Sequence, residues 1–194
     1  MRTERINAFT DGVVAIIITI MVLELPTPKG ATWAALRPDI PLFIAYALAY
    51  VNVGIFWNNH HHLMNMVRHV NGKILWANLF LLFWLSLMPF VIRWIGEDGL
   101  HALPVAAYGV VLLLSSLSYM LLEHKVITSQ GPDSALHAAL GRGMKEWASL
   151  AIQLSGIGLS FVNVYAAIAC YIAIALIWFI PDLRVERALK GSDG

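Results

Sequence analysis

The chain has 194 residues, of which 59% are hydrophobic and only 13% are charged. Soluble domains carry about 25% charged residues, so this composition excludes an ordinary soluble globular protein. With 13 Lys and Arg against 12 Asp and Glu, the net charge of +1 offers no cationic excess for a phosphate backbone, and we expect no nucleic-acid partner. The single cysteine, Cys170, excludes an intrachain disulfide framework.

Stretches without charged residues divide the chain into apolar segments, which cover residues 12–23, 40–67, 74–92, 99–122 and 147–181. About 20 helical residues, at about 1.5 Å each, cross a hydrocarbon core of about 30 Å, so these segments predict membrane helices. A single helix over 147–181 would be about 52 Å long, far more than the core requires. We therefore divide the last segment at 160–163, after Gly156 and Gly158.

The prediction is an all-α membrane protein with six transmembrane helices in a single domain, spanning approximately 5–25, 40–67, 74–95, 103–123, 145–161 and 164–181. Cytoplasmic loops hold the excess of Lys and Arg. Six spans with both termini cytoplasmic leave only Lys29, Arg37 and Arg93 outside. We therefore expect a multi-pass protein of the plasma membrane. The cytoplasmic cations would be Arg2, Arg5, Arg68, Lys73, Lys125, Arg142, Lys145, Arg184, Arg187 and Lys190.

The first span has two faces of different chemistry. At about 100° per residue, a mostly apolar set falls within an arc of about 100°, and Asp11 projects about 80° to 180° away from it. Ordinary helix packing explains such a face as well as a functional role does. The set comprises Arg5, Phe9, Gly12, Ile16, Thr19, Ile20 and Leu23.

Asp11 needs a partner inside the protein, because an unpaired carboxylate near lipid is costly. The second span offers Trp57, His60 and His61 near its cytoplasmic end, and the third span offers Asn78. We predict interhelical hydrogen bonds from Asp11 to this stretch of the second span, His60 and His61 in particular, and to Asn78. Consecutive histidines project about 100° apart and cannot converge on one ion, so we expect no metal site and no cofactor.

At this point the motifs resemble a known family. Arg5-x-x-x-Phe9-Thr10-Asp11 is similar to the first-helix signature of the transmembrane protein 175 family of potassium channels, in which serine usually stands at the position of Thr10. Trp57-x-x-His60-His61 is similar to its second-helix pattern, and Asn78 followed by Pro89-Phe90 to its third. Ile92 stands where the family commonly has threonine.

The resemblance implies a homotetramer in the lipid bilayer, with a pore formed by the first helix of each subunit. By position, Ile16 would be the constriction, Thr19 the neighbouring hydroxyl ring, and Ile20 and Leu23 further apolar layers. The permeant ions would be monovalent cations, potassium in particular. The sequence lacks the Thr-Val-Gly-Tyr-Gly filter of other potassium channels. The family's signature residues are Arg5, Phe9, Thr10, Asp11, Trp57, His60, His61 and Asn78.

Two other classes of protein remain open. A proton-coupled transporter could use Asp11 with His60 or His61 as a proton relay, because ionisable groups inside spans often carry protons. A membrane metalloenzyme would need several histidine clusters, and only one is present. We therefore expect a channel and not an enzyme.

Overall fold

The computed structural model describes residues 3–67, 69–130 and 144–179, and these residues contain helices and no strand. The predicted all-α class is confirmed. The elements are α1 (Thr3–Leu23), α2 (Trp33–Leu36), the 3-10 turn η1 (Arg37–Asp39), α3 (Ile40–Asn65), α4 (Gly72–Leu85), α5 (Met88–Asp98), α6 (Ala102–Gln130), α8 (Met144–Leu159) and α9 (Val164–Phe179).

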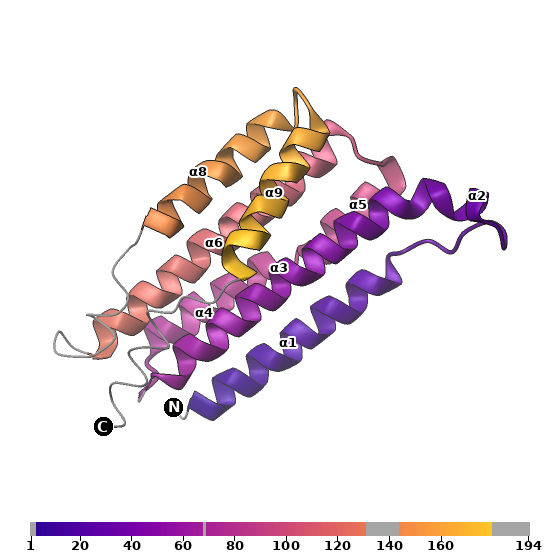
Figure 1. Ribbon diagram of the computed structural model, residues 1–194. Helices are drawn as coiled ribbons and strands as arrows, with labels where there is room; N and C mark the ends of the chain where they lie inside the picture. The colour runs from indigo at the N-terminus through magenta and orange to yellow at the C-terminus, as the bar shows by residue number, and fades with distance from the viewer. Residues whose placement is uncertain (1–2, 68, 131–143, 180–194) are drawn as a thin grey trace.

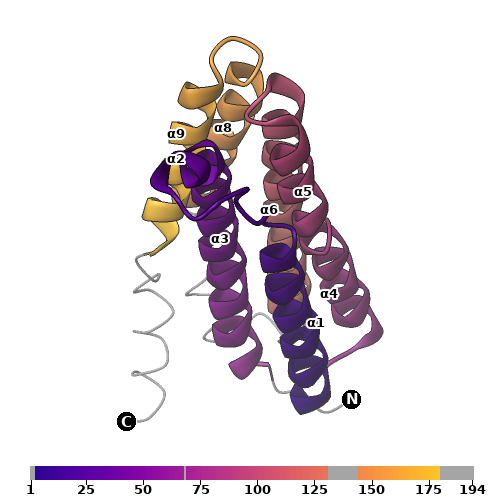
Figure 2. The ribbon, with the colours of Figure 1, turned by 90° about the vertical axis from the view of Figure 1, so that its right-hand side faces the viewer.

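The long helices lie side by side in an elongated bundle (Figures 1 and 2). α1 packs against α3, α4 and α5 on one side of the bundle. α4 and α5 both lie along α6, and α6, α8 and α9 pack together on the other side. α1 therefore lies at an edge of the bundle, with one face toward the other helices and one face away from them.

The third predicted span contains a helix break, with α4 before it and α5 after it. α4 ends at Leu85, and α5 begins at Met88 with Pro89 in its first turn. Proline has no N–H and its ring clashes with the carbonyl four residues earlier, which here is that of Leu85. The helix breaks at 86–87 for this reason, while the stretch Gly72–Asp98 as a whole is long and apolar enough to cross a membrane.

Among the residues that the structure describes, four helical stretches are long and apolar enough to cross a membrane: Thr3–Leu23, Trp33–Asn65, Gly72–Asp98 and Ala102–Ser129. α8 and α9 have 16 residues each, about 24 Å at about 1.5 Å per residue. The chain turns between them over 160–163, where the sequence predicts a turn. The end of the predicted last span and most of the 125–146 connector lie outside the described residues, as do Arg2, Arg68, Arg142, Arg184, Arg187 and Lys190.

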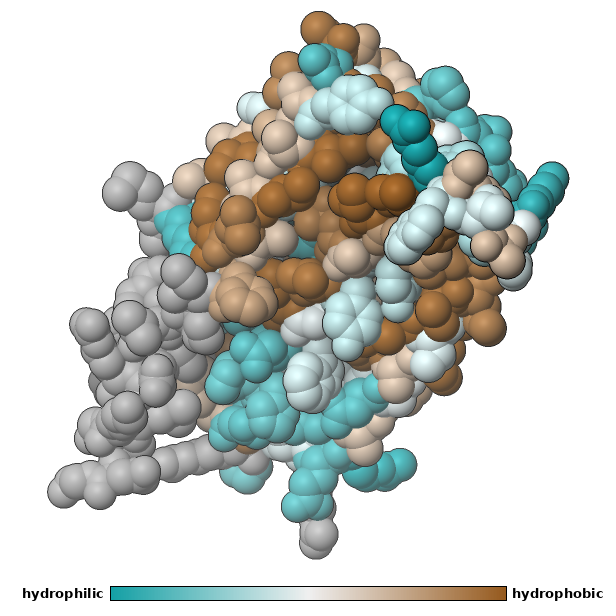
Figure 3. Space-filling view, turned by 45° about the vertical axis from the view of Figure 1, so that its right-hand side comes forward, coloured by the Kyte–Doolittle hydropathy of each residue, from teal (hydrophilic) through white to brown (hydrophobic). Residues whose placement is uncertain are grey.

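Apolar side chains also cover much of the outer surface. In Figure 3 they dominate the middle of the face, while hydrophilic residues gather toward its ends. Phe83, Phe90 and Leu154 are each more than half exposed. Apolar surface of this extent requires lipid or protein against it, which agrees with the membrane helices that the sequence predicts.

Candidate functional site on the first helix

The inner face of α1 is a stripe that packs into the bundle. Its members recur every three or four residues, which is the spacing of one face of a helix. Four are apolar, and the fifth is Thr10, which is only 1% exposed. The buried stripe consists of Ile6, Thr10, Val14, Ile17 and Met21.

The opposite face of α1 is exposed, because no other part of the described chain covers it. Ile16 is 58% exposed, Ile20 40% and Leu23 79%. Gly12 adds to the open surface, because a Cβ built on it would meet nothing within 4 Å. The residues expected on one arc therefore do share one face, and that face is directed away from the other helices of the bundle.

Thr19 is the hydroxyl on this exposed face. Its Oγ1 donates to the carbonyl oxygens of Ala15 at 3.0 Å and Ile16 at 2.9 Å. A hydroxyl has one hydrogen and two lone pairs, so donation into the helix leaves the lone pairs as acceptors. The side chain therefore presents an oxygen acceptor outside the helix, the chemistry that suits a cation.

A buried hydrogen-bond chain ties α1 to α4 and α3. Asn78 Nδ2 donates to Thr10 Oγ1 at 3.0 Å, and Asn78 Oδ1 lies 2.8 Å from His60 Nε2. The amide oxygen only accepts, so His60 Nε2 carries a hydrogen and donates. All three side chains are at least 97% buried. These hydrogen bonds fix the rotation of α1 relative to its neighbours. The buried side chain of Asn78 finds its acceptor on α1 only when Thr10 faces inward.

Asp11 bonds to one of the candidate partners on the second span, which is Trp57. Trp57 Nε1 donates to Asp11 Oδ1 at 2.8 Å, and no hydrogen bond within the described part of the chain joins Asp11 to His60, His61 or Asn78. A partner on the second span is therefore present, but the expected bonds to His60, His61 and Asn78 are not formed within the described residues. Thr10 and Asp11 project about 100° apart, so Thr10 takes the buried position and Asp11 turns to the outer side of α3.

The remaining signature residues lie at the edge of this arrangement. The His61 ring stacks on the Trp57 ring, with centroids 6.0 Å apart and planes 29° apart. Phe9 is 53% exposed on the outer face of α1. Arg5 is exposed, and no hydrogen bond or ion pair links it to the described residues. Arg5 therefore does not join the Asp11 contact within one chain.

The histidines diverge as the helical repeat requires. His60 is buried, whereas His61 and His62 are exposed. In the described residues, no group of three or more His, Cys, Asp or Glu side chains is placed to hold a metal ion.

An ion pair near the other end of α1 was not expected from the sequence. Arg93 Nε on α5 lies 3.8 Å from Glu24 Oε2, and 2.8 Å from Glu97 Oε1. Glu24 follows α1 directly, so the pair connects the end of the first helix to α5. The signal was present in the sequence, because these charges flank the ends of two spans that finish on the same side.

Fold and site together define an all-helical, multi-pass membrane protein. Residues 5–89 match the family model described as the endosomal/lysosomal potassium channel TMEM175. A protein of Chryseobacterium named as a potassium channel is 51% identical over 190 residues, which are 98% of this chain and 99% of that protein. One of Streptomyces collinus with the same description is 29% identical and covers 89% of both chains.

Two further proteins, one human and one bacterial, are similar to this chain. Human TMEM175, named an endosomal/lysosomal proton channel, is 39% identical over 77 residues, 34% of this chain and 15% of the human protein. The crystal structure of a lysosomal potassium-selective channel TMEM175 homolog from Chamaesiphon minutus superposes with a TM-score of 0.77 at 23% identity, over 94% of this chain and 97% of that one. The chain belongs to the TMEM175 family, which is a family of ion channels and not of enzymes.

Proposed function

We propose that this chain is one subunit of a homotetrameric, potassium-permeable cation channel whose pore is lined by α1. The observation that carries the proposal is the outer face of α1, where Ile16, Thr19 and Leu23 remain exposed within the subunit. A single subunit cannot enclose a pore with one helix face. Several copies around an axis would cover this face and leave a passage between the α1 helices.

The proposed passage works by wetting and drying. A ring of Ile16 side chains closes a narrow pore by excluding water, and a wider ring admits partly hydrated ions. Thr19 would supply oxygen contacts next to the constriction, since its hydroxyl hydrogen points into its own helix. Ile20 and Leu23 would form further apolar layers. Few protein oxygens replace the water of the ion, so we expect modest selectivity for potassium over sodium.

The proposed orientation places both termini in the cytoplasm of a cell whose plasma membrane holds the channel. Among the described cations, Arg5, Lys73, Lys125 and Lys145 lie at helix ends on the proposed cytoplasmic side. Lys29, Arg37 and Arg93 lie toward the other side. The bias follows the rule that cytoplasmic loops hold the excess of Lys and Arg.

Recording from purified protein in a planar bilayer tests the proposal directly. With potassium chloride on one side and sodium chloride on the other, we expect discrete current steps and a reversal potential displaced toward that of potassium. Flux that saturates with substrate and requires a proton gradient, without current steps, would contradict the channel.

Native mass spectrometry in mild detergent tests the assembly. We expect a mass of four chains. A monomer as the sole species would leave the outer face of α1 without a partner and refute the tetramer.

Proton-coupled transport through Asp11 and His60 or His61 is the second candidate function. Buried His60 sits in a hydrogen-bonded chain across three helices, which is the kind of group that can hold a proton. Asp11, however, bonds to Trp57 and not to that chain. Because the two ends of the relay have separate partners, we rank the transporter second.

A further inference from the structure

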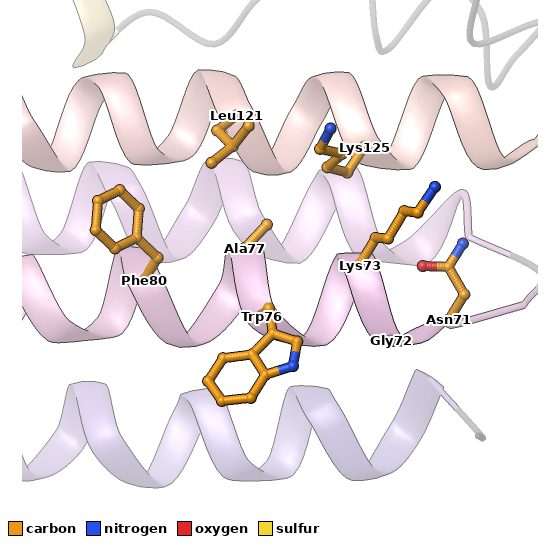
Figure 4. A pocket seen from close by; sticks show the side chains of 8 residues that line it. All are labelled: Asn71, Gly72, Lys73, Trp76, Ala77, Phe80, Leu121 and Lys125. Atoms are coloured by element: carbon orange, nitrogen blue, oxygen red, sulfur yellow. The ribbon is translucent and has the colours of Figure 1, made fainter.

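A groove lies between the beginning of α4 and the last third of α6 (Figure 4). It has a volume of about 980 Å³ and is open to the outside of the subunit. It does not include any of the exposed residues on the outer face of α1. Its lining therefore belongs to a different surface from the proposed pore, and it takes no part in the function proposed above.

Two cations stand at the end of the groove. Lys73 comes from the first turn of α4 and Lys125 from α6, so the two charges that line this end come from helices that are far apart in sequence. Within the described residues, no carboxylate lies within 4.0 Å of either ammonium group. The groove end therefore presents two positive charges that the described carboxylates do not neutralise.

Asn71 adds a donor at the same end. Its Oδ1 accepts from the backbone N–H of Ile74 at 3.0 Å and so caps α4. An amide with its oxygen engaged in this way still has two N–H donors on Nδ2. An anion at the groove end would thus meet two ammonium groups and an amide.

The rest of the groove is apolar and leads away from the lysines toward the middle of the helices. On α4, Trp76 and Phe80 follow Lys73 at intervals of three and four residues; on α6, Leu121 precedes Lys125 by four. These intervals keep each set on one helix face. Trp76 is 76% exposed, Phe80 45% and Leu121 39%, so the apolar part of the groove is open.

From this arrangement we propose that the groove binds an anionic phospholipid. The phosphate contacts Lys73 and Lys125, and an acyl chain lies against Trp76, Phe80 and Leu121. Basic pockets between membrane helices at the cytoplasmic side suit acidic headgroups, and tryptophan favours the membrane interface. A free phosphate ion would use only the charged end, whereas a lipid uses both the charged end and the apolar floor.

Native mass spectrometry of the purified full-length oligomer measures this binding. The probes are dioleoylphosphatidylglycerol and dioleoylphosphatidylcholine, which have the same acyl chains and differ in net charge. We expect the anionic lipid to bind more tightly. The double variant Lys73→Gln with Lys125→Gln should lose about tenfold or more in affinity for the anionic lipid and little for the zwitterionic one.

A matched control removes two charges at the opposite end of the bundle. Lys29→Gln with Arg37→Gln changes the net charge equally and should keep the preference for the anionic lipid. Trp76→Ala should weaken both lipids, because it removes part of the apolar floor that they share. Glycerol 3-phosphate, a soluble headgroup without acyl chains, should not compete at concentrations that saturate the lipid.

Three results would overturn the proposal. Equal affinity for the two lipids, or equal losses in the two double variants, would show that the lysines do not form a site. Effective competition by glycerol 3-phosphate would identify a site for a soluble anion. Dissociation of the oligomer in the Lys73→Gln, Lys125→Gln variant would mean that the groove is a subunit interface. Because the readout is bound lipid, none of these results depends on ion conduction.

Discussion

Asn78 on α4 donates from Nδ2 to the hydroxyl of Thr10 on α1 at 3.0 Å, and both side chains are only 1% exposed. The same amide accepts from His60 on α3 through its other end. One asparagine side chain on α4 is therefore hydrogen-bonded to both α1 and α3. Since an unsatisfied buried polar group is costly, this contact holds α1 in the rotation that turns Ile16 and Thr19 away from the bundle.

Thr10→Val tests this role. Valine keeps the shape but removes the hydroxyl, so Asn78 Nδ2 loses its partner, and we expect a loss of about 1 to 3 kcal/mol in stability. The thermal denaturation midpoint of the oligomer in detergent measures the effect. Thr19→Val is the matched control, because that exposed hydroxyl bonds only within its own helix. Equal shifts for the two variants would refute the role assigned to Thr10.

Asp11 is expected to be structural through Trp57. Asp11→Ala and Trp57→Phe should each lower the yield of assembled oligomer, because each removes one side of the 2.8 Å hydrogen bond. The double variant should lose little more than either single variant, since the contact is already absent. Size-exclusion chromatography after matched expression gives the yields. Additive losses, or an Asp11→Ala variant that assembles normally and changes only ion selectivity, would contradict this assignment.

Ile16→Asn tests the constriction. A polar side chain of similar length should wet a closed ring, and we expect higher conductance or leak with weaker discrimination among cations. Ile18→Asn is the control, because Ile18 is half-buried and lies on a different face. Single-channel recording on protein shown to be tetrameric compares them. No change at position 16, or the same change at both positions, would mean that α1 does not line the path.

Gly156 tests the packing of the outer helices. A Cβ on Gly156 would lie 2.6 Å from Cε1 of Tyr171 and 3.2 Å from Cβ of Cys170. Tyr171 is almost fully buried, so its ring has little room to move away from a new methyl group, and α8 and α9 would have to shift apart. We expect Gly156→Ala to lose about 1 to 3 kcal/mol, the usual cost of overpacking. Gly158→Ala should be nearly neutral, because a Cβ there meets nothing within 4 Å. Thermal denaturation compares the two, and a larger loss at Gly158 would show that this contact is not the tight one.

Much of the architecture follows from the sequence because lipid imposes a simple rule on a chain. Charge-free segments of membrane length form helices in lipid, so the all-α class and the turn at 160–163 can be predicted from the sequence. The outer face of α1 can also be predicted from the sequence, because the helical repeat alone places Ile16, Thr19 and Leu23 on one face. Pro89 also indicates a helix break just before it, which the hydropathy pattern alone does not show.

The partners of individual polar groups were decided by tertiary structure. Thr10 and Asp11 are adjacent in sequence, and both had Asn78 and the histidines within plausible reach. Which of the two entered the core depended on the rotation of α1 against α3 and α4, a property of three packed helices and not of any one of them. The same holds for Arg93 and Glu24, and for Lys73 and Lys125. Helical periodicity predicts the direction in which a side chain points from the axis of its own helix. Only the packing of the helices determines which residue of a neighbouring helix lies in that direction.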